Sequence, residues 1–391
     1  MAAPPAALRG LPRLDDLGDL HGRRVLVRVD FNVPLEAGPD GGWVVADDFR
    51  IRASIPTLEW LLGRGATVVC CSHLGRPDGH PDPRWTMDPV RAALSKLCPE
   101  VSLMENLRFD PGEESNDPAF VDRLVVGFDA YVNDAFGASH REHASVMGPP
   151  RRLPSAAGLR LAEEVEVVAG LLDEPARPFV AVLGGAKVAD KLGVVAAVGH
   201  VADAVLIGGA MAFTFLASQG RHVGASLVDA TRIDDCWALL GGAARVVLPS
   251  DVVALSPGAS FGPGASDGEV QTFEGDLPDG WVGLDIGVAS SASFARLLAG
   301  ARTILWNGPM GAFEDERFAH GTEAVARAIA SSDAFSVVGG GDSALALERS
   351  GLADAVSFVS TGGGATLRLL ERGDLPALAA LRAAPNAERC S

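Results

Sequence analysis

Residues 179–191 read FVAVLGGAKVADK, in which an apolar run is followed by two glycines and a pair of lysines. The run has the length and composition of a buried β-strand, and the glycines allow close backbone approach to a ligand. We expect a helix to begin in this segment, so that its free amide groups favour phosphate. Lys187 and Lys191, four positions apart, would then share one helix face. The stretch is not a Walker A loop, because neither lysine is preceded by glycine or followed by serine or threonine.

Two further segments have the same order of strand, glycines and helix. They are VVGGGDSA at residues 337–344 and STGGGAT at residues 360–366. Asp342, in the first of them, is a candidate ligand for Mg²⁺. Open parallel sheets bind ligands outside the carboxyl ends of their strands, so three such junctions on one sheet predict a phosphate cradle. A dehydrogenase is disfavoured, because no GxGxxG motif with a following acidic residue stands at such a junction.

Apolar runs alternate with amphipathic stretches along the 391 residues. The expected strands are 24–29, 66–71, 129–132, 179–183, 204–207, 245–249, 303–306, 335–338 and 355–359, and the expected helices include 51–63, 90–97 and 159–172. This alternation predicts an α/β fold with mostly parallel sheets covered on both faces. The length suits two domains. Because Pro175 and Pro178 follow it closely, helix 159–172 is expected to link them.

The chain is acidic, with a formal net charge of −17 and a pI near 4.9. It therefore repels nucleic acid and anionic lipid, and a small anionic substrate would need a local basic island. No apolar run reaches the roughly 18 residues that span a bilayer, and residues 1–13 lack a signal-peptide core.

The five cysteines form no CxxC pair and are expected to be free thiols in a reducing cytoplasm: Cys70, Cys71, Cys98, Cys236 and Cys390.

Basic and polar residues follow several apolar runs of the first half. They are Arg28, Asp30 and Asn32 in RVDFNVP, Arg50 in DDFRIRAS, His73 and Arg76 in SHLGRP, Arg108 in ENLRF, and His140, Arg141 and His143 in SHREHAS. Arginine forks bind phosphate and carboxylate in a bidentate manner, so these arginines with His73 are candidates for the basic island. The alternative is a set of scattered surface arginines, with His140 and His143 as structural residues. Neither a Ser-His-Asp order nor a Cys/His cluster with metal-ligand spacing is present.

Eight motifs of this chain occur in one order: RVDFNVP, SHLGRP, ENLRF, YVNDAFG, GGAKVADK, WNGPMGAFE, GGGDSA and VSTGGGA. With this order and spacing the chain resembles the phosphoglycerate kinases from about Asp19 to about Leu381. The resemblance implies two doubly wound, Rossmann-like parallel-sheet domains that face each other across a cleft. The expected parts are a 3-phosphoglycerate-binding domain (1–158), a linker helix (159–174), a nucleotide-binding domain (175–375) and a tail returning to the first domain (376–391).

The same resemblance implies a substrate site in the first domain. Asp30 and Asn32 would hold the glycerate carboxylate and hydroxyl, and Arg50 would lie near the reacting carboxyl. The non-transferring phosphate would be surrounded by His73, Arg76, Arg108 and Arg141, and the set is completed by Arg28, Phe31, Leu74 and Gly75. The substrates would be 3-phosphoglycerate or 1,3-bisphosphoglycerate, and the protein is expected to be a cytoplasmic monomer without nucleic-acid or membrane partners.

In the second domain the resemblance implies a site for ATP or ADP with Mg²⁺. Lys191 would contact the nucleotide phosphates, and Asp342 would hold the metal. Gly208, Gly209 and Gly283 would line the adenine slot, Glu314 would bind the ribose, and the nucleotide set is completed by Gly184, Ala186, Asn307, Pro309, Gly340, Gly341 and Ser343. Lys187, Arg50, Gly363 and Gly364 would stabilise the transferring group. Because the attacking carboxylate is already ionised, the reaction would need positioning, charge neutralisation and domain closure but no general base.

Several residues depart from the family pattern. Phe358 stands where histidine is usual, Ala210 replaces a glycine, Glu142 a small residue and Arg368 a glutamate, and ValAlaSer follows Gly287 where ProLysThr is usual. None of them removes a residue assigned to the chemistry. Two alternatives stay open. One is a diverged paralogue that phosphorylates another small phosphorylated or phosphonylated carboxylic acid, and the other is a catalytically silent nucleotide-binding relative.

Overall fold

The computed structural model describes residues 6–242, 245–262 and 264–385. The chain forms two compact units, one of Met1–Ala169 with Arg372–Ser391 and the other of Gly170–Glu371. Cys390 and the end of the predicted tail lie outside the described residues. None of the helices in the described ranges is long and apolar enough to cross a membrane.

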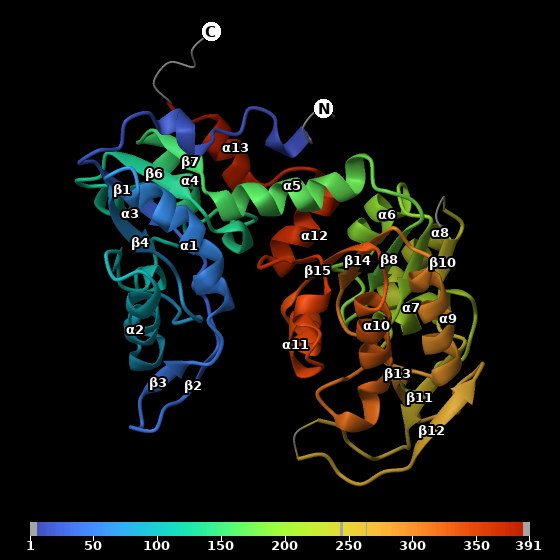
Figure 1. Ribbon diagram of the computed structural model, residues 1–391. Coiled ribbons are helices and arrows are strands. Elements are labelled where there is room, and N and C mark those ends of the chain that lie inside the picture. Colours follow the sequence, from blue (N-terminus) through green and yellow to red (C-terminus); the bar gives the residue numbers. More distant parts are fainter. Residues whose placement is uncertain (1–5, 243–244, 263, 386–391) are drawn as a thin grey trace. The chain divides into compact units, whose positions relative to one another are not determined.

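Unit 1 is built on a five-stranded parallel sheet in the order β5-β4-β1-β6-β7. Four of these strands, β1, β4, β6 and β7, are labelled in Figure 1. The strands are β1 (Arg24–Arg28), β4 (Thr67–Cys71), β5 (Ser102–Leu103), β6 (Ala130–Asn133) and β7 (Ser155–Ala157), and a hairpin of β2 (Leu35–Ala37) and β3 (Trp43–Val45) is separate. The helices are α1 (Phe49–Leu62), α2 (Asp88–Leu97), α3 (Pro118–Leu124), α4 (Ala144–Met147) and α13 (Pro376–Arg382). Val25 and Val27 pack in one cluster with Ile51 and Leu58 of α1. The predicted strands 24–29, 66–71 and 129–132 are confirmed to within a residue or two.

The end of the chain belongs to unit 1. Ala377 of α13 is fully buried in a small apolar cluster with Ala135, Ala138 and Val146, and its amide donates to the carbonyl of Ser139 at 3.2 Å. Arg382 donates to the carbonyl of Ala7 at 2.8 Å and pairs with Asp374. Helix α13 therefore packs on residues from both ends of the unit 1 sequence.

Unit 2 is built on a six-stranded parallel sheet in the order β10-β9-β8-β14-β15-β16. Strands β8, β10, β14 and β15 are labelled in Figure 1. The strands are β8 (Phe179–Leu183), β9 (Ala204–Ile207), β10 (Arg245–Val247), β14 (Thr303–Asn307), β15 (Phe335–Gly339) and β16 (Phe358–Val359). The helices are α6 (Leu192–Gly199), α7 (Met211–Ser218), α8 (Ile233–Leu240), α9 (Val288–Ala299), α10 (His320–Ala330), α11 (Gly341–Arg349) and α12 (Gly363–Arg372). Every residue of β8 and of β14 is buried, as expected for strands covered on both faces. The doubly wound parallel fold predicted for both units is confirmed.

Helix α5 (Leu159–Asp173) matches the predicted helix 159–172 to within one residue. The division between the two units falls inside it, between Ala169 and Gly170. At its start, Oδ1 of the buried Asp134 accepts from the amides of Arg160 and Leu161 at 3.0 and 3.2 Å. A buried carboxylate from the end of β6 thus satisfies amides that the first helical turn leaves free.

One expectation about local structure is wrong, and one sheet was not predicted. No helix begins in the GGAKVADK segment, because α6 starts only at Leu192, so Lys187 and Lys191 do not share a helix face. An antiparallel sheet of β11 (Asp251–Leu255), β12 (Val270–Glu274) and β13 (Val282–Ile286) was not anticipated. Strand β12 is mostly exposed and has no continuous apolar run, so it lacks the pattern of a buried strand.

Candidate active site

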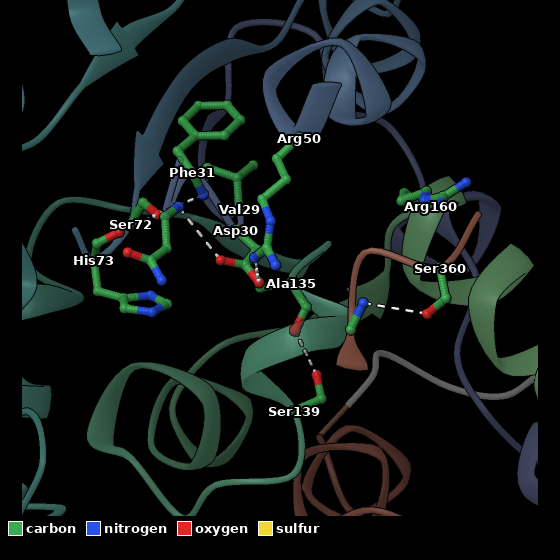
Figure 2. Close-up of polar contacts among 12 residues, drawn as sticks. Val29, Asp30, Phe31, Arg50, Ser72, His73, Ala135, Ser139, Arg160 and Ser360 are labelled. Atoms are coloured by element: carbon green, nitrogen blue, oxygen red, sulfur yellow. Dashed lines mark hydrogen bonds and ion pairs between the residues drawn. The ribbon is translucent and has the colours of Figure 1, made fainter. Parts of the chain in front are cut away.

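The carboxyl end of β1 leads directly into Asp30, whose carboxylate is buried beside Arg50 of α1. The Arg50 Nη1 donates to Asp30 Oδ2 at 2.7 Å, as Figure 2 shows. The amide of Asn32 donates to Asp30 Oδ1 at 3.4 Å. Burial alone would raise the pKa of Asp30, but the nearby guanidinium groups of Arg50 and Arg28 outweigh it and hold that pKa below its usual value. Asp30 is therefore an ionised acceptor that orients Arg50.

A tight loop after β4 carries the SHLGRP motif and is held from three sides. The Asn32 Oδ1 accepts from the Gly75 amide at 2.9 Å, and Arg108 Nη1 donates to the Gly75 carbonyl at 2.6 Å. The side chain of Asn106 bonds both backbone groups of Leu74. Gly75 has φ of +61°, and a Cβ there would collide with the ring of Trp85. Only glycine fits this position, so the loop is held in one shape.

The basic residues of unit 1 converge on one region. Arg28 and Arg108 are buried, and both, together with Arg141, disfavour a charge on His143. Burial and these guanidinium groups lower the pKa of His143 to about 4. The alternative of scattered surface arginines is thus wrong for Arg28 and Arg108. Arg76 lies exposed in the same loop and forms no hydrogen bond or ion pair with another described side chain.

The glycine loops of unit 2 are hydrogen-bonded to one another at the carboxyl edge of the sheet. The Gly184 amide donates to the Asn307 carbonyl at 3.0 Å, and the Gly185 amide donates to the Pro309 carbonyl at 3.0 Å. On the neighbouring strand, the Gly209 amide donates to the Met310 carbonyl at 2.9 Å. A Cβ at Gly184 would collide with the Pro309 carbonyl, so this close approach requires glycine.

The side chain of Lys191 is hydrogen-bonded to two residues of these loops, Gly184 and Asn307. Its Nζ donates to the Gly184 carbonyl at 2.5 Å, to the Asn307 carbonyl at 3.0 Å and to Asn307 Oδ1 at 2.7 Å. Burial lowers the pKa of Lys191 to about 8, although Asp342 and Asp190 oppose the shift. A phosphate could bind this ammonium group only by displacing one of the three oxygens. Lys187 is exposed and forms no hydrogen bond or ion pair with another described side chain.

The other two glycine junctions lie at the same carboxyl edge of the unit 2 sheet, and both have the predicted strand–glycine–helix order. Asn307 Nδ2 donates to the Gly339 carbonyl at 2.8 Å, and the Gly308 amide donates to Ser343 Oγ at 2.7 Å. A Cβ at Gly363 would lie 2.9 Å from the Cα of Gly340, so these two loops nearly touch. Gly364, Gly341 and Asp342 are exposed at the starts of α12 and α11. The three junctions predicted from the sequence are thus brought together.

The residues predicted to bind the adenine and the ribose lie in two different places. Gly209 lines a narrow apolar cavity with Phe213 and Met310, and a Cβ at Gly208 or at Gly283 would collide with Met310 or Phe213. The space that Gly208 and Gly283 face is thus filled by side chains of the protein itself. Glu314 is exposed and lines a different pocket, with Thr322 and Arg349 among its neighbours. The structure therefore does not place Glu314 in the glycine-lined slot.

Magnesium would have Asp342 as its protein ligand. The described residues contain no group of three or more His, Cys, Asp or Glu side chains that could hold a metal ion. Mg²⁺ is commonly held by one or two carboxylates together with substrate phosphates, and the exposed Asp342 beside the cradle fits that arrangement.

A cluster of arginines around buried polar groups in one α/β unit and interlocked glycine loops at the carboxyl edge of the sheet in the other suit a small-molecule phosphotransferase. The chain belongs to the phosphoglycerate kinase family, whose profile, described as phosphoglycerate kinase, matches residues 14–373. Members of this family are phosphotransferases with a carboxyl group as acceptor.

Relatives from bacteria and archaea agree with this assignment. The chain is 51% identical to a phosphoglycerate kinase of Rubrobacter xylanophilus, over 93% of this chain and 96% of that protein. It is 50% identical to that of Frankia alni, over 94% of this chain and 99% of that protein. Among solved structures, phosphoglycerate kinase from Coxiella burnetii superposes with a TM-score of 0.82 at 34% identity, over 95% of this chain and 98% of that one. The Pyrococcus horikoshii enzyme gives 0.80 at 31% identity, over 95% and 98% of the two chains.

Proposed function

We propose that this chain transfers the acyl phosphate of 1,3-bisphosphoglycerate reversibly to MgADP, giving 3-phosphoglycerate and MgATP. The proposal is carried by two features together. Unit 1 holds an arginine cluster in which Arg28 and Arg108 are buried, and unit 2 holds three interlocked glycine junctions. A site for one small anion would need only the first, and a nucleotide-binding protein only the second.

On the substrate side, the proposal assigns each group by its chemistry. Asp30 and Asn32 receive the glycerate hydroxyl and carboxyl region, and Arg50, already oriented by Asp30, faces the reacting carboxylate. The non-transferring phosphate meets the exposed and half-buried donors Arg76 and Arg141, which form no hydrogen bond with a described side chain. Arg28 donates three hydrogen bonds within the protein, to Ser145, Val29 and His73, and supplies charge and orientation.

On the nucleotide side, Lys187 and the amides of Gly363 and Gly364 neutralise the transferring phosphoryl group. Their amides stand at the start of α12, where backbone donors have no helical partner. Asp342 would hold Mg²⁺, which when bound would supply positive charge beside the nucleotide phosphates. The transition state carries spread negative charge and little covalent chemistry for the protein to perform, so placement and electrostatics account for catalysis. Domain closure during turnover, a monomeric state and a cytoplasmic location complete the proposal.

A coupled assay tests this function directly. Purified protein is mixed with MgATP and 3-phosphoglycerate, and glyceraldehyde-3-phosphate dehydrogenase with NADH reports the 1,3-bisphosphoglycerate formed. We expect NADH oxidation that requires both substrates and Mg²⁺. Absence of turnover with intact MgATP binding would favour a paralogue with another phosphorylated or phosphonylated acid as substrate, and absence of binding would favour a silent relative. Relatives about 50% identical that carry the kinase name support the first outcome.

The pH dependence of nucleotide affinity should report the charge on Lys191. An amine is charged below its pKa, so the free protein loses this ammonium group as pH rises through about 8. If a phosphate binds the charged form, the dissociation constant of MgADP should then rise by up to roughly tenfold per pH unit. Calorimetric titrations between pH 7 and pH 10 would measure it. Lys191→Arg, which stays charged in this range, should give a flatter profile, and parallel profiles would contradict a role for the Lys191 charge.

A further inference from the structure

A continuous chain of hydrogen bonds runs through the interior of unit 1 and ends at His73. Glu113 Oε1 and Oε2 accept from the Oγ and the amide of Ser145 at 2.6 and 2.9 Å. Ser145 Oγ accepts from Arg28 Nε at 2.8 Å, and Arg28 Nη2 bonds His73 Nδ1 at 3.0 Å. Glu113 and Ser145 are fully buried, and Arg28 and His73 nearly so. Neither Glu113 nor Ser145 belongs to the set of substrate residues expected from the sequence.

The direction of each bond follows from the groups involved. A guanidinium group can only donate, so the lone pair of Ser145 Oγ receives Arg28 Nε and the hydroxyl proton goes to Glu113. For the same reason His73 Nδ1 must accept from Arg28, which leaves the ring proton on Nε2. Burial first, and the Arg28 charge second, lower the pKa of His73 well below 6.5. The imidazole is therefore neutral at pH 7 and has a single favoured tautomer.

The carboxylate at the far end of the chain has an electrostatic role. A guanidinium group taken out of water without a compensating charge is strongly disfavoured, and Arg28 is 1% exposed. Glu113 is 0% exposed and is one hydroxyl away from Arg28, so it is the buried counter-charge on that side. Its negative charge balances the positive charge of Arg28 inside the protein.

We propose that Glu113 and Ser145 are positioning residues of the anion site. They hold Arg28 so that His73 keeps its proton on Nε2 and can donate one hydrogen bond to the non-transferring phosphate of the substrate. This inference rests on the proposed function for the identity of the anion, but the tautomer of His73 is a property of the protein alone.

The decisive measurement is the long-range ¹H–¹⁵N spectrum of the histidine rings, with the His73 signals assigned by their loss in His73→Gln. Wild type should show one His73 tautomer, protonated on Nε2. Ser145→Ala removes the hydroxyl that holds Arg28, so we expect a second population protonated on Nδ1. In the kinase assay, KM for 3-phosphoglycerate should rise roughly tenfold or more, as for loss of a hydrogen bond to a charged group, with little change in KM for MgATP.

Ser139→Ala is the matched control. Ser139 is equally buried in unit 1 and bonds the Ala135 carbonyl at 2.8 Å, but it is no part of the chain to His73 (Figure 2). This variant should keep the single tautomer of His73. If Ser145→Ala does not fold, Glu113→Gln is measured instead and should shift the tautomer in the same direction. A single unchanged tautomer in the folded variant would overturn the proposal. If the variants shift the tautomer of His73 but the wild-type protein shows no kinase turnover, the hydrogen-bond chain is supported and the proposed function is refuted.

Discussion

Lys187→Ala is expected to lower kcat by at least about 10²-fold, with little change in stability. The transferring phosphoryl group carries negative charge in the transition state, and removal of one preorganised donor to such charge typically costs roughly 10²–10³ in rate. The side chain of Lys187 is exposed and forms no hydrogen bond with another described side chain, so its truncation leaves no buried group unpaired. The coupled assay gives kcat, and thermal unfolding gives the stability.

A third lysine of the chain provides a matched control variant for this experiment. Lys96 is the only lysine besides Lys187 and Lys191, and it is exposed in the last turn of α2. Lys96→Ala should therefore keep wild-type kcat while removing the same charge from the protein. If Lys187→Ala retained kcat within a few-fold of wild type, its assignment to the transferring group would be wrong.

Arg50→Ala is expected to reduce kcat/KM for 3-phosphoglycerate by roughly 10²–10³ and also to lower stability. The guanidinium group is held at 2.7 Å from the buried Asp30, so the substitution leaves Asp30 without this cation. It also removes the charge that we propose to lie beside the reacting carboxyl. Breaking a buried pair from one side is strongly destabilising, and the partial exposure of Arg50 should reduce that cost. Loss of Arg50 should raise the pKa of Asp30, so the loss of stability should be largest at neutral pH, where Asp30 must be ionised.

Two further variants, Arg52→Ala and Arg50→Lys, separate the effect of Arg50 on activity from its effect on stability. Arg52 lies on the same helix, pairs with Asp48 at 2.7 Å and is largely exposed, so Arg52→Ala should be close to wild type in both measurements. Arg50→Lys should recover stability better than activity, because an ammonium group can pair with Asp30 but lacks the fork that binds a carboxylate. Equal losses in Arg50→Ala and Arg52→Ala would exclude a specific role for Arg50.

The sequence alone predicted the parallel sheets and the glycine junctions of this protein. Strands such as β8 and β14 are buried on both faces, so they appear as continuous apolar runs whatever their neighbours are. The glycines after them are required by close backbone approach and could be recognised locally. The eight ordered motifs indicated the family for the same reason, since each is a short, local pattern.

Only the tertiary structure decided how the candidate side chains are held. Lys187 and Lys191 are four residues apart, yet one is exposed and the other is bonded to Asn307, 116 positions away. Glu113, Ser145, Arg28 and His73 come from four separate segments, and no local pattern marks the first two as neighbours of an anion site. Strand β12 depends on pairing with β11 rather than on its own apolar residues. A sequence reports what each segment can bury, whereas the partners of a polar group depend on distant residues that folding brings together.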